Sequence, residues 1–180
     1  MENPGNQEGL IHELKSLISS VELDDLAFLL HKKKPLRVLI YGTQGVRRVT
    51  QIITELWFDA GLISHQHVSR RVGRDQLIGD YCGWSKRKTL AVMEDCENGV
   101  IVIENLDQIW TGYGDYKGNE VIHTLIQYMR VNIESIESGI NPDDYNIIFT
   151  CFKSNGCDPL FEVAPGFRRF ITLTIDLNRK

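Results

Sequence analysis

The chain contains 180 residues, of which 42% are hydrophobic and 24% charged, which is enough to bury the core of one domain. Its formal net charge is −4, so it lacks the overall basic character of a nucleic-acid-binding domain, and we expect no nucleic-acid partner. No apolar run is long enough to span a membrane, and residues 1–8 carry no secretory leader pattern, which predicts a soluble intracellular protein without a membrane partner.

The N-terminal part is predicted to contain a short tail and two helices. Residues 1–9 are polar and include Gly and Pro, which predicts a disordered tail. Apolar residues recur at helical spacing from Leu10 onward, and a second helix is expected over 23–31. A proline ends this segment of N-terminal helices, residues 10–35, because proline cannot continue a helix, and the core of the domain follows over 36–180.

The first strand is predicted over 36–41, and it leads through a glycine-containing loop into an amphipathic helix over 49–59. Strand, loop and helix in this order form the setting of a P-loop, in which backbone N–H groups at a helix N-terminus surround phosphate. The P-loop pattern is G-x-x-x-x-G-K-[ST]. The residues that fill it, as a candidate nucleotide-binding loop, are Gly42, Thr43, Gln44, Gly45, Val46, Arg47, Arg48, Val49 and Thr50.

Three replacements weaken the match between this loop and a phosphate-binding P-loop. Arg47 takes the place of the second glycine, where a side chain crowds the approach of phosphate. Arg48 replaces the lysine and keeps a positive charge, but its planar fork does not substitute for a compact ammonium. Val49 replaces the hydroxyl residue that binds Mg²⁺, and Thr50, one residue later, points about 100° further round the helix. Because of these replacements, we expect the binding of ATP and Mg²⁺ to be weak or lost. The stretch also fits an ordinary strand–turn–helix with no nucleotide role.

A second landmark is the apolar strand over 99–105, which ends in Glu104 and Asn105. In P-loop ATPases a strand of this kind ends in Asp-Glu, where the Asp holds Mg²⁺ through water and the Glu activates the attacking water. Glu104 stands at the Asp position, and its carboxylate can still bind a metal although its side chain is one methylene longer than that of Asp. Asn105 carries no charge and cannot act as a general base. We therefore expect hydrolysis to be poor even where nucleotide binds.

The remaining elements complete an α/β pattern. Helices are predicted over 88–97 and 120–137, and apolar strands over 145–152 and 171–177. Helices that alternate with apolar strands predict a P-loop NTPase-like parallel sheet with helices on both faces. Ligands of such folds bind outside the carboxyl ends of the strands, where the candidate loop and the acid–amide pair both fall.

These motifs together resemble the AAA+ ATPase core of the red-type rubisco activase and stage V sporulation protein K group, over residues 36–178. The resemblance implies the fold of an AAA+ large subdomain, with ATP and Mg²⁺ as cofactors. Four segments carry it in the same order, namely 42–45, 75–84, 100–105 and 164–170. The departures fall at catalytic positions, namely Arg47, Val49, Glu104 and Asn105.

Three further residues acquire roles by this resemblance. Tyr81 corresponds to the aromatic residue of a pore loop that grips substrate polypeptide, although it also fits a turn that packs on the domain surface. Lys153 stands where the family senses the γ-phosphate, and it equally fits a surface lysine. Arg168 matches the first arginine of a motif directed at a neighbouring subunit's nucleotide, while Phe170 stands at the second.

Proteins of this family carry a small helical lid after the core. The present chain stops after its last predicted strand, so we expect the lid to be absent. Contacts to adenine and part of the subunit interface would then be missing, which is a second reason to expect no working motor.

Cysteines and histidines give no sign of a metal site. The four cysteines, at positions 82, 96, 151 and 157, lack C-x-x-C spacing, and the five histidines are dispersed. We therefore expect reduced thiols and no metal bound by these side chains.

Three functions remain open from the sequence. The first is a pseudo-ATPase that acts through protein contacts, beside an active AAA+ paralogue or in a homo-oligomer, with Arg168 completing a neighbour's site. The second is a weakly active ATPase in which Arg48 and Glu104 suffice. The third is an interaction module that keeps the fold without nucleotide. We prefer the first, because the scaffold is retained while the hydrolytic residues are replaced.

Overall fold

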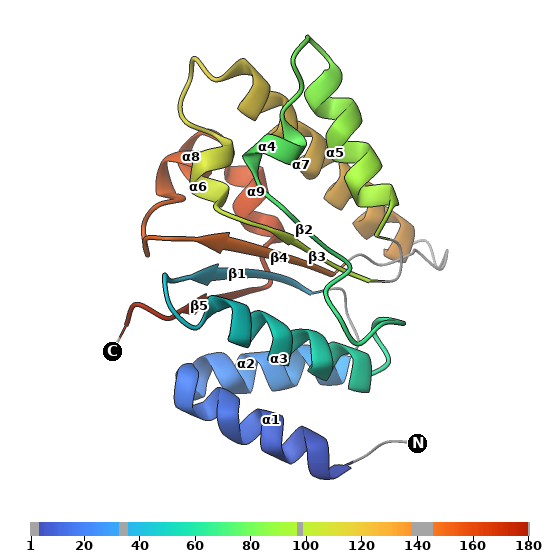
Figure 1. The fold of residues 1–180 in the computed structure, drawn as a ribbon, viewed down its shortest axis with the longest axis vertical. Helices are drawn as coiled ribbons and strands as arrows, with labels where there is room; N and C mark the ends of the chain where they lie inside the picture. The colour runs from blue at the N-terminus through green and yellow to red at the C-terminus, as the bar shows by residue number, and fades with distance from the viewer. Residues whose placement is uncertain (1–3, 33–35, 97–98, 138–145, 180) are drawn as a thin grey trace.

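One parallel β-sheet with helices on both faces forms the centre of the protein (Figure 1). The computed structural model describes residues 4–32, 36–96, 99–137 and 146–179. The strands within these ranges are β1 Arg37–Tyr41, β2 Arg70–Val72, β3 Val100–Ile103, β4 Asn146–Cys151 and β5 Leu173–Asp176. Their order in the sheet is β2-β3-β4-β1-β5, and every neighbouring pair is parallel. The predicted α/β fold with a parallel sheet is therefore confirmed.

The helices divide between the two faces of the sheet according to their place in the chain (Figure 1). Those that precede β2 cover one face, and they are α1 Pro4–Leu17, α2 Ser20–Lys32 and α3 Val46–Asp59. Those between β2 and β5 cover the other, and they are α4 Arg74–Leu77, α5 Trp84–Glu94, α6 Leu106–Ile109, α7 Tyr116–Glu137, α8 Asp158–Val163 and α9 Pro165–Phe170. Parallel strands require such crossovers, because a tight turn cannot return the chain in the same direction.

Alternating side chains of the strands supply two layers of core. Val38 of β1 belongs to the layer under α1, α2 and α3, whereas the next residue, Leu39, belongs to the opposite layer. The first layer contains the fully buried Trp57 of α3. In the second, Phe149 of β4 packs edge-to-face on Phe167 of α9, with ring centroids 5.1 Å apart. Burial on both faces explains why the central strands read as continuous apolar runs in the sequence.

The N-terminus differs from the sequence prediction. α1 begins at Pro4, so the expectation of a disordered tail is wrong for residues 4–9, while residues 1–3 lie outside the described residues. Proline is tolerated in the first turn of a helix, and the fully buried Leu14 holds α1 against the core. Residues 33–35, where the sequence predicted the end of the helical segment, also lie outside the described residues.

A capping box starts α2 at Ser20, three residues before the predicted helix. The N–H of Ser19 donates to Oε2 of Glu22 at 2.8 Å, and the N–H of Glu22 donates to Oγ of Ser19 at 3.3 Å. The other oxygen of Glu22 accepts a hydrogen bond from the N–H of Asp176 at 2.9 Å. This glutamate therefore joins α2 to the end of β5.

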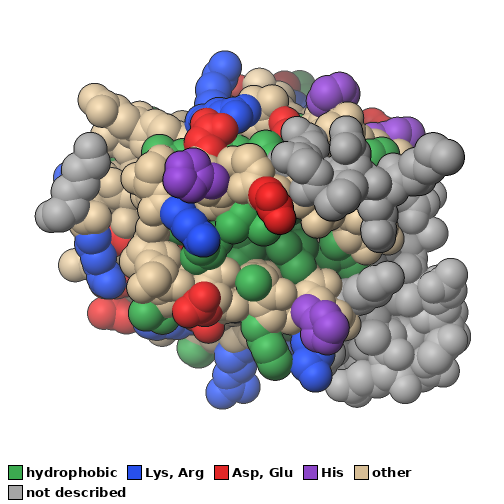
Figure 2. All heavy atoms as spheres, turned by 90° about the horizontal axis from the view of Figure 1, so that it is seen from below, with side chains coloured by type: hydrophobic (Ala, Val, Ile, Leu, Met, Phe, Trp, Pro, Cys, Tyr) green, Lys and Arg blue, Asp and Glu red, His purple; other side chains and the backbone are tan. Residues whose placement is uncertain are grey.

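The outer face of the N-terminal helices carries a group of hydrophobic side chains with charged and histidine side chains around it (Figure 2). The exposed large hydrophobic residues of α2 are Val21 and Phe28. Among the helices of the described residues, none combines the length and the apolar character that a membrane crossing requires.

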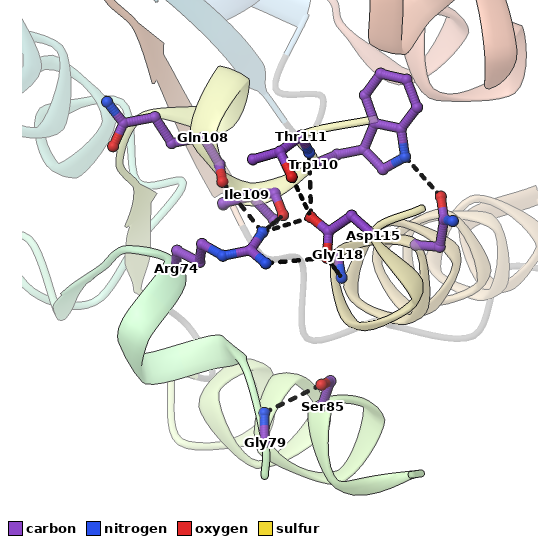
Figure 3. A network of polar contacts seen from close by, with 10 residues as sticks. Arg74, Gly79, Ser85, Gln108, Ile109, Trp110, Thr111, Asp115 and Gly118 are labelled. Atoms are coloured by element: carbon purple, nitrogen blue, oxygen red, sulfur yellow. Dashed lines mark hydrogen bonds and ion pairs between the residues drawn. The ribbon is translucent and has the colours of Figure 1, made fainter. Parts of the chain in front are cut away.

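A carboxylate shielded from water holds the loop between α6 and α7 (Figure 3). Asp115 accepts hydrogen bonds from the two terminal nitrogens of Arg74, at 2.6 and 2.9 Å, and from the backbone N–H groups of Thr111 and Gly118, at 3.1 and 2.9 Å. Arg74 also donates to backbone carbonyl oxygens of α6. The side chain of Asp115 is 8% exposed, so water competes little for these contacts. Charge pairing therefore fixes a loop that is otherwise rich in glycine.

We expect Asp115→Asn to lower the free energy of unfolding at pH 7 by about 2–4 kcal/mol, because the Arg74 guanidinium then lacks its counter-charge. The hydrogen bond from Arg74 holds the pKa of Asp115 well below its ordinary value. The wild-type stabilisation is therefore present above the unfolded-state pKa, about 3.9, and is lost as the pH falls toward the folded-state pKa. Urea denaturation at about pH 7, 5 and 3 should show the deficit of the variant shrinking at the lowest pH.

The matched control is Asp95→Asn. Asp95 pairs with Arg70 at 2.9 Å, but its side chain is 67% exposed. Its replacement should change stability by less than about 0.5 kcal/mol. Equal losses in the two variants, or a deficit that stays constant across the three pH values, would contradict the role given to Asp115.

Candidate functional site

The carboxyl ends of β1, β3 and β4 meet at a cleft with a volume of about 540 Å³. Its walls come from the loop after β1, the first turn of α3, the ends of β3 and β4, and one side chain of β2. The lining residues are Gly42, Thr43, Gly45, Val46, Arg47, Arg48, Arg71, Glu104, Asn105, Thr150 and Phe152. Most of the candidate loop and both residues of the acid–amide pair therefore lie together, at the edge where parallel sheets bind ligands.

The loop over 42–45 presents the N-terminus of α3 to this cleft. Gly45 caps α3 with φ at +75°, a left-handed conformation that favours glycine, and no side chain caps the helix. Gly42 lies so close to Leu177 that a Cβ added to it would be 2.9 Å from the Cβ of Leu177. The first amide groups of α3, uncapped by any side chain, are available to an anion, which the positive end of a helix favours.

Arg48, at the position of the P-loop lysine, pairs with an acid of the N-terminal helix. Its Nε donates to Oε1 of Glu13 in α1 at 2.6 Å, and its Nη2 donates to Oε2 of the same carboxylate. This bidentate contact holds the pKa of Glu13 below its ordinary value. Both side chains remain about two-fifths exposed, at 41% and 40%, so Arg48 borders the cleft while its charge is engaged by α1.

The hydroxyl that would bind Mg²⁺ in a P-loop is missing here. Val49 is fully buried in the core layer beneath α3 and carries no oxygen on its side chain. The hydroxyl of Thr50 donates to the carbonyl of Val46 in the preceding turn, at 2.7 Å. Neither residue therefore offers a ligand to a metal at the loop.

Glu104 lies at the end of β3, where it faces an arginine of the neighbouring strand. Nη1 of Arg71 is 3.4 Å from Oε1 of Glu104, and both side chains are partly exposed, at 27% and 34%. The N–H of Glu104 donates to the carbonyl of Val72 at 2.7 Å, which continues the pairing of β2 with β3. Within the described residues, no three His, Cys, Asp or Glu side chains gather into a metal-binding group. The acid at the expected metal position is therefore paired with a guanidinium.

Asn105 occupies an unusual backbone conformation at the start of α6. Its φ and ψ are 55° and 58°, in the left-handed region that asparagine tolerates better than most residues. Its N–H donates to Oγ1 of Thr150 on β4, at 3.1 Å. The end of β3 is thereby attached to the end of β4, and the side chain beside Glu104 is a neutral amide.

A second cavity, of about 430 Å³, lies on the other side of the loop. Its lining residues are Ser16, Leu17, Thr43, Gln44, Gly45, Leu177 and Asn178. Thr43 and Gly45 line both spaces, whereas Gln44 belongs to this cavity and not to the cleft. The loop therefore borders two separate spaces.

Lys153 and Arg168, whose roles the resemblance implied, do not line the cleft. Lys153 is exposed in the turn after β4 and is absent from the cleft lining. Arg168 of α9 is exposed, with its guanidinium carbon 5.7 Å from the centre of the Phe161 ring. It borders a separate cavity of about 260 Å³, which Tyr41 and Asp158 also line. Arg168 is thus accessible to a neighbouring molecule and has no place in the cleft of its own chain.

Tyr81 stands on the exposed loop between α4 and α5. Its side chain is 66% exposed and packs edge-to-face on Trp84, with ring centroids 4.9 Å apart. The N–H of Gly79 donates to Oγ of Ser85 at 3.0 Å (Figure 3). The N–H of Gly83, just before α5, donates to Oε1 of Glu120 in α7 at 2.9 Å. The two ends of the loop are therefore fixed, and the aromatic pair between them is accessible.

Sequence reasoning did not identify Glu13 and Arg71 as site residues. Each reaches the site by pairing with a candidate residue that is distant in the chain, 35 positions away for Glu13 and 33 for Arg71. Arg70 and Arg71 are adjacent in the sequence, and the sequence alone does not distinguish which of them reaches the site.

Comparison with known proteins gives distant relatives. No family model matches the chain. It is similar to Stage V sporulation protein K of Bacillus subtilis, with 26% identity over 146 residues, and to a CfxQ homologue of Guillardia theta, with 27% over 170 residues. It is also similar to the protein CfxQ of Xanthobacter flavus, with 28% identity over 145 residues.

The alignments cover much of this chain but a smaller part of the relatives. They include 80%, 92% and 78% of the present chain and 42%, 54% and 42% of the three relatives, so the chain spans about half the length of the curated relatives it matches. These relatives are AAA+ proteins, and the parallel sheet with its loop between β1 and α3 agrees with that likeness. The similarity supports a relationship between this chain and the AAA+ proteins.

Proposed function

We propose that the chain is an AAA+-like pseudo-ATPase domain that acts through contacts with other proteins and does not hydrolyse ATP. The observation that carries this proposal is the amide of Asn105 at the position where P-loop ATPases carry the glutamate that activates water. A neutral amide cannot accept a proton from an attacking water, so the cleft lacks a general base at that position. The Glu104 carboxylate beside it is engaged by Arg71.

The fit of ATP and Mg²⁺ to the cleft is unequal. The left-handed Gly45 and the uncapped N-terminus of α3 suit a phosphate group, and the cleft beside them has a volume of about 540 Å³. Mg²⁺ requires oxygen ligands in near-octahedral geometry, whereas Val49 has no oxygen and Glu104 faces a guanidinium. The residues present therefore suit a phosphate-bearing ligand and do not suit the metal.

Arg168 supports the part of the proposal that concerns protein contacts. It is exposed at the end of α9, outside the cleft of its own chain, and it matches an arginine that the related family directs at a neighbouring subunit. In this proposal Arg168 completes the nucleotide site of a second subunit, either an active AAA+ paralogue or another copy of this chain. An arginine can stabilise the charge that develops during phosphoryl transfer in a site that belongs to another molecule.

A second candidate is a weakly active ATPase. Arg48 and Glu104 line the same cleft as Gly42, so a cation and a carboxylate are both present near the loop. Turnover would then depend on Arg48 in spite of its contact with Glu13.

An ATPase assay separates the two candidates. We expect the purified chain with ATP and Mg²⁺ to release phosphate no faster than an identically prepared Arg48→Ala variant, because Asn105 cannot act as a general base and Val49 offers no oxygen to the metal. Comparison with the variant removes the contribution of contaminating ATPases. Turnover by the wild-type chain that Arg48→Ala abolishes would reject the pseudo-ATPase and favour the weak enzyme.

The role of Arg168 has its own test. Where an active AAA+ ATPase co-purifies with the chain, we expect addition of the chain to raise the turnover of that partner and Arg168→Ala to remove roughly tenfold or more of the stimulation. The adjacent Arg169 is also exposed, so Arg169→Ala is the matched control and should keep the stimulation. The same loss in both variants would show that general positive charge, and not Arg168, is responsible.

A further inference from the structure

We infer that the cleft binds a polyphosphate anion without a divalent cation, and that the Arg71 guanidinium supplies the positive charge that a metal would otherwise bring. The inference rests on the proposed function, in which the cleft remains a ligand site without hydrolysis. Mg²⁺ does not fit the residues of the cleft, and Arg71 of β2 takes a role in ligand binding.

The position of Arg71 is set by the pairing of β2 with β3. Arg71 lies opposite Val102 in the parallel register, two residues before Glu104. From there its side chain reaches the Glu104 carboxylate, and both residues line the cleft together with Gly42 and Gly45. The guanidinium therefore stands on the wall that faces the phosphate-binding loop.

A divalent ion and Arg71 compete for the same carboxylate. Mg²⁺ bound to Glu104 would lie about 2.1 Å from a carboxylate oxygen, and Nη1 of Arg71 is 3.4 Å from Oε1 of that carboxylate. Two cations that contact one carboxylate repel each other, and this repulsion is stronger in a site that is partly shielded from water. Arg71 is part of the chain, so its guanidinium contacts Glu104 whether or not a metal is present.

The rest of the cleft is also positive. Arg47, Arg48 and Arg71 line it, with Arg71 opposite Glu104 and Arg48 paired with Glu13 of α1, and the N-terminus of α3 adds the positive end of a helix. Guanidinium groups bind phosphate oxygens through two parallel hydrogen bonds, so they can neutralise a polyphosphate without an ion. The charges of the cleft therefore match an anion that arrives free of metal.

Isothermal titration calorimetry with ATP and with inorganic tripolyphosphate tests the inference. Each probe is titrated once with EDTA and once with excess Mg²⁺, at matched ionic strength so that screening is equal. We expect binding in EDTA, and we expect Mg²⁺ to leave the affinity unchanged or to weaken it. Tripolyphosphate should bind within about tenfold of ATP, because the arginines and the helix N-terminus recognise phosphate.

The decisive variant is Arg71→Gln, and its matched control is Arg70→Gln. Arg70 is the neighbouring residue on β2, pairs with the exposed Asp95, and does not line the cleft, so both variants remove one positive charge from one strand. Arg71→Gln should weaken metal-free binding by about tenfold or more, the value of a lost charge-assisted contact, whereas Arg70→Gln should change it less than about twofold. Melting temperatures of both variants near that of the wild type establish that the fold is intact.

The outcomes separate this inference from the proposed function. Affinity that rises at least tenfold with Mg²⁺, the absence of binding to either probe, binding of ATP without tripolyphosphate, or equal losses in the two arginine variants would each overturn the inference. None of these results would by itself show hydrolysis. Turnover that Arg48→Ala abolishes would overturn the proposed function instead, whatever the metal dependence of binding.

Discussion

The position of β1 between β4 and β5 is the constraint on which the cleft depends. Tyr41, the last residue of β1, lies opposite Cys151 of β4 and Asp176 of β5. The pairing continues past the strand, because Gly42 donates to the carbonyl of Cys151 at 2.9 Å and Leu177 donates to the carbonyl of Tyr41 at 2.8 Å. The loop therefore starts from backbone that is hydrogen-bonded on both sides. Its shape depends on these bonds, so it can persist while the side chains around it change.

The charged residues of the cleft follow a common pattern. Arg48 stands where a P-loop has lysine, and Arg71 faces the carboxylate that would serve a metal, and each arginine is paired with an acid of a different element. Ion pairs between partly exposed side chains add little to stability. Their consequence is electrostatic, because Glu13 and Glu104 place negative charge beside the two guanidinium groups. The charge of the cleft therefore depends on α1 and β2 as well as on the loop after β1.

The sequence predicted the parts of this arrangement that are local. Strands buried on both faces read as apolar runs, and the glycines after β1 identify the loop. The pairs that define the charge of the site are not local, since they depend on which elements lie side by side. Alternation along β2 sends Arg70 and Arg71 to opposite faces, and only the place of β2 beside β3 shows which of them meets Glu104. Helices of four to six residues, such as α4 and α8, are too short to show a period.

The contact between Glu13 and Arg48 links the N-terminal helix to the cleft. Glu13 of α1 occupies the Nε/Nη2 edge of the Arg48 guanidinium and brings a negative charge to it, so α1 would lower the attraction of Arg48 for an anion in the cleft. A partner that displaces α1 from α3 would release Arg48 and strengthen anion binding. By thermodynamic reciprocity, the anion would then favour that partner by the same factor. If the cleft binds an anion, the contact between Glu13 and Arg48 would make the N-terminal helix the link between the outer face of the protein and the cleft.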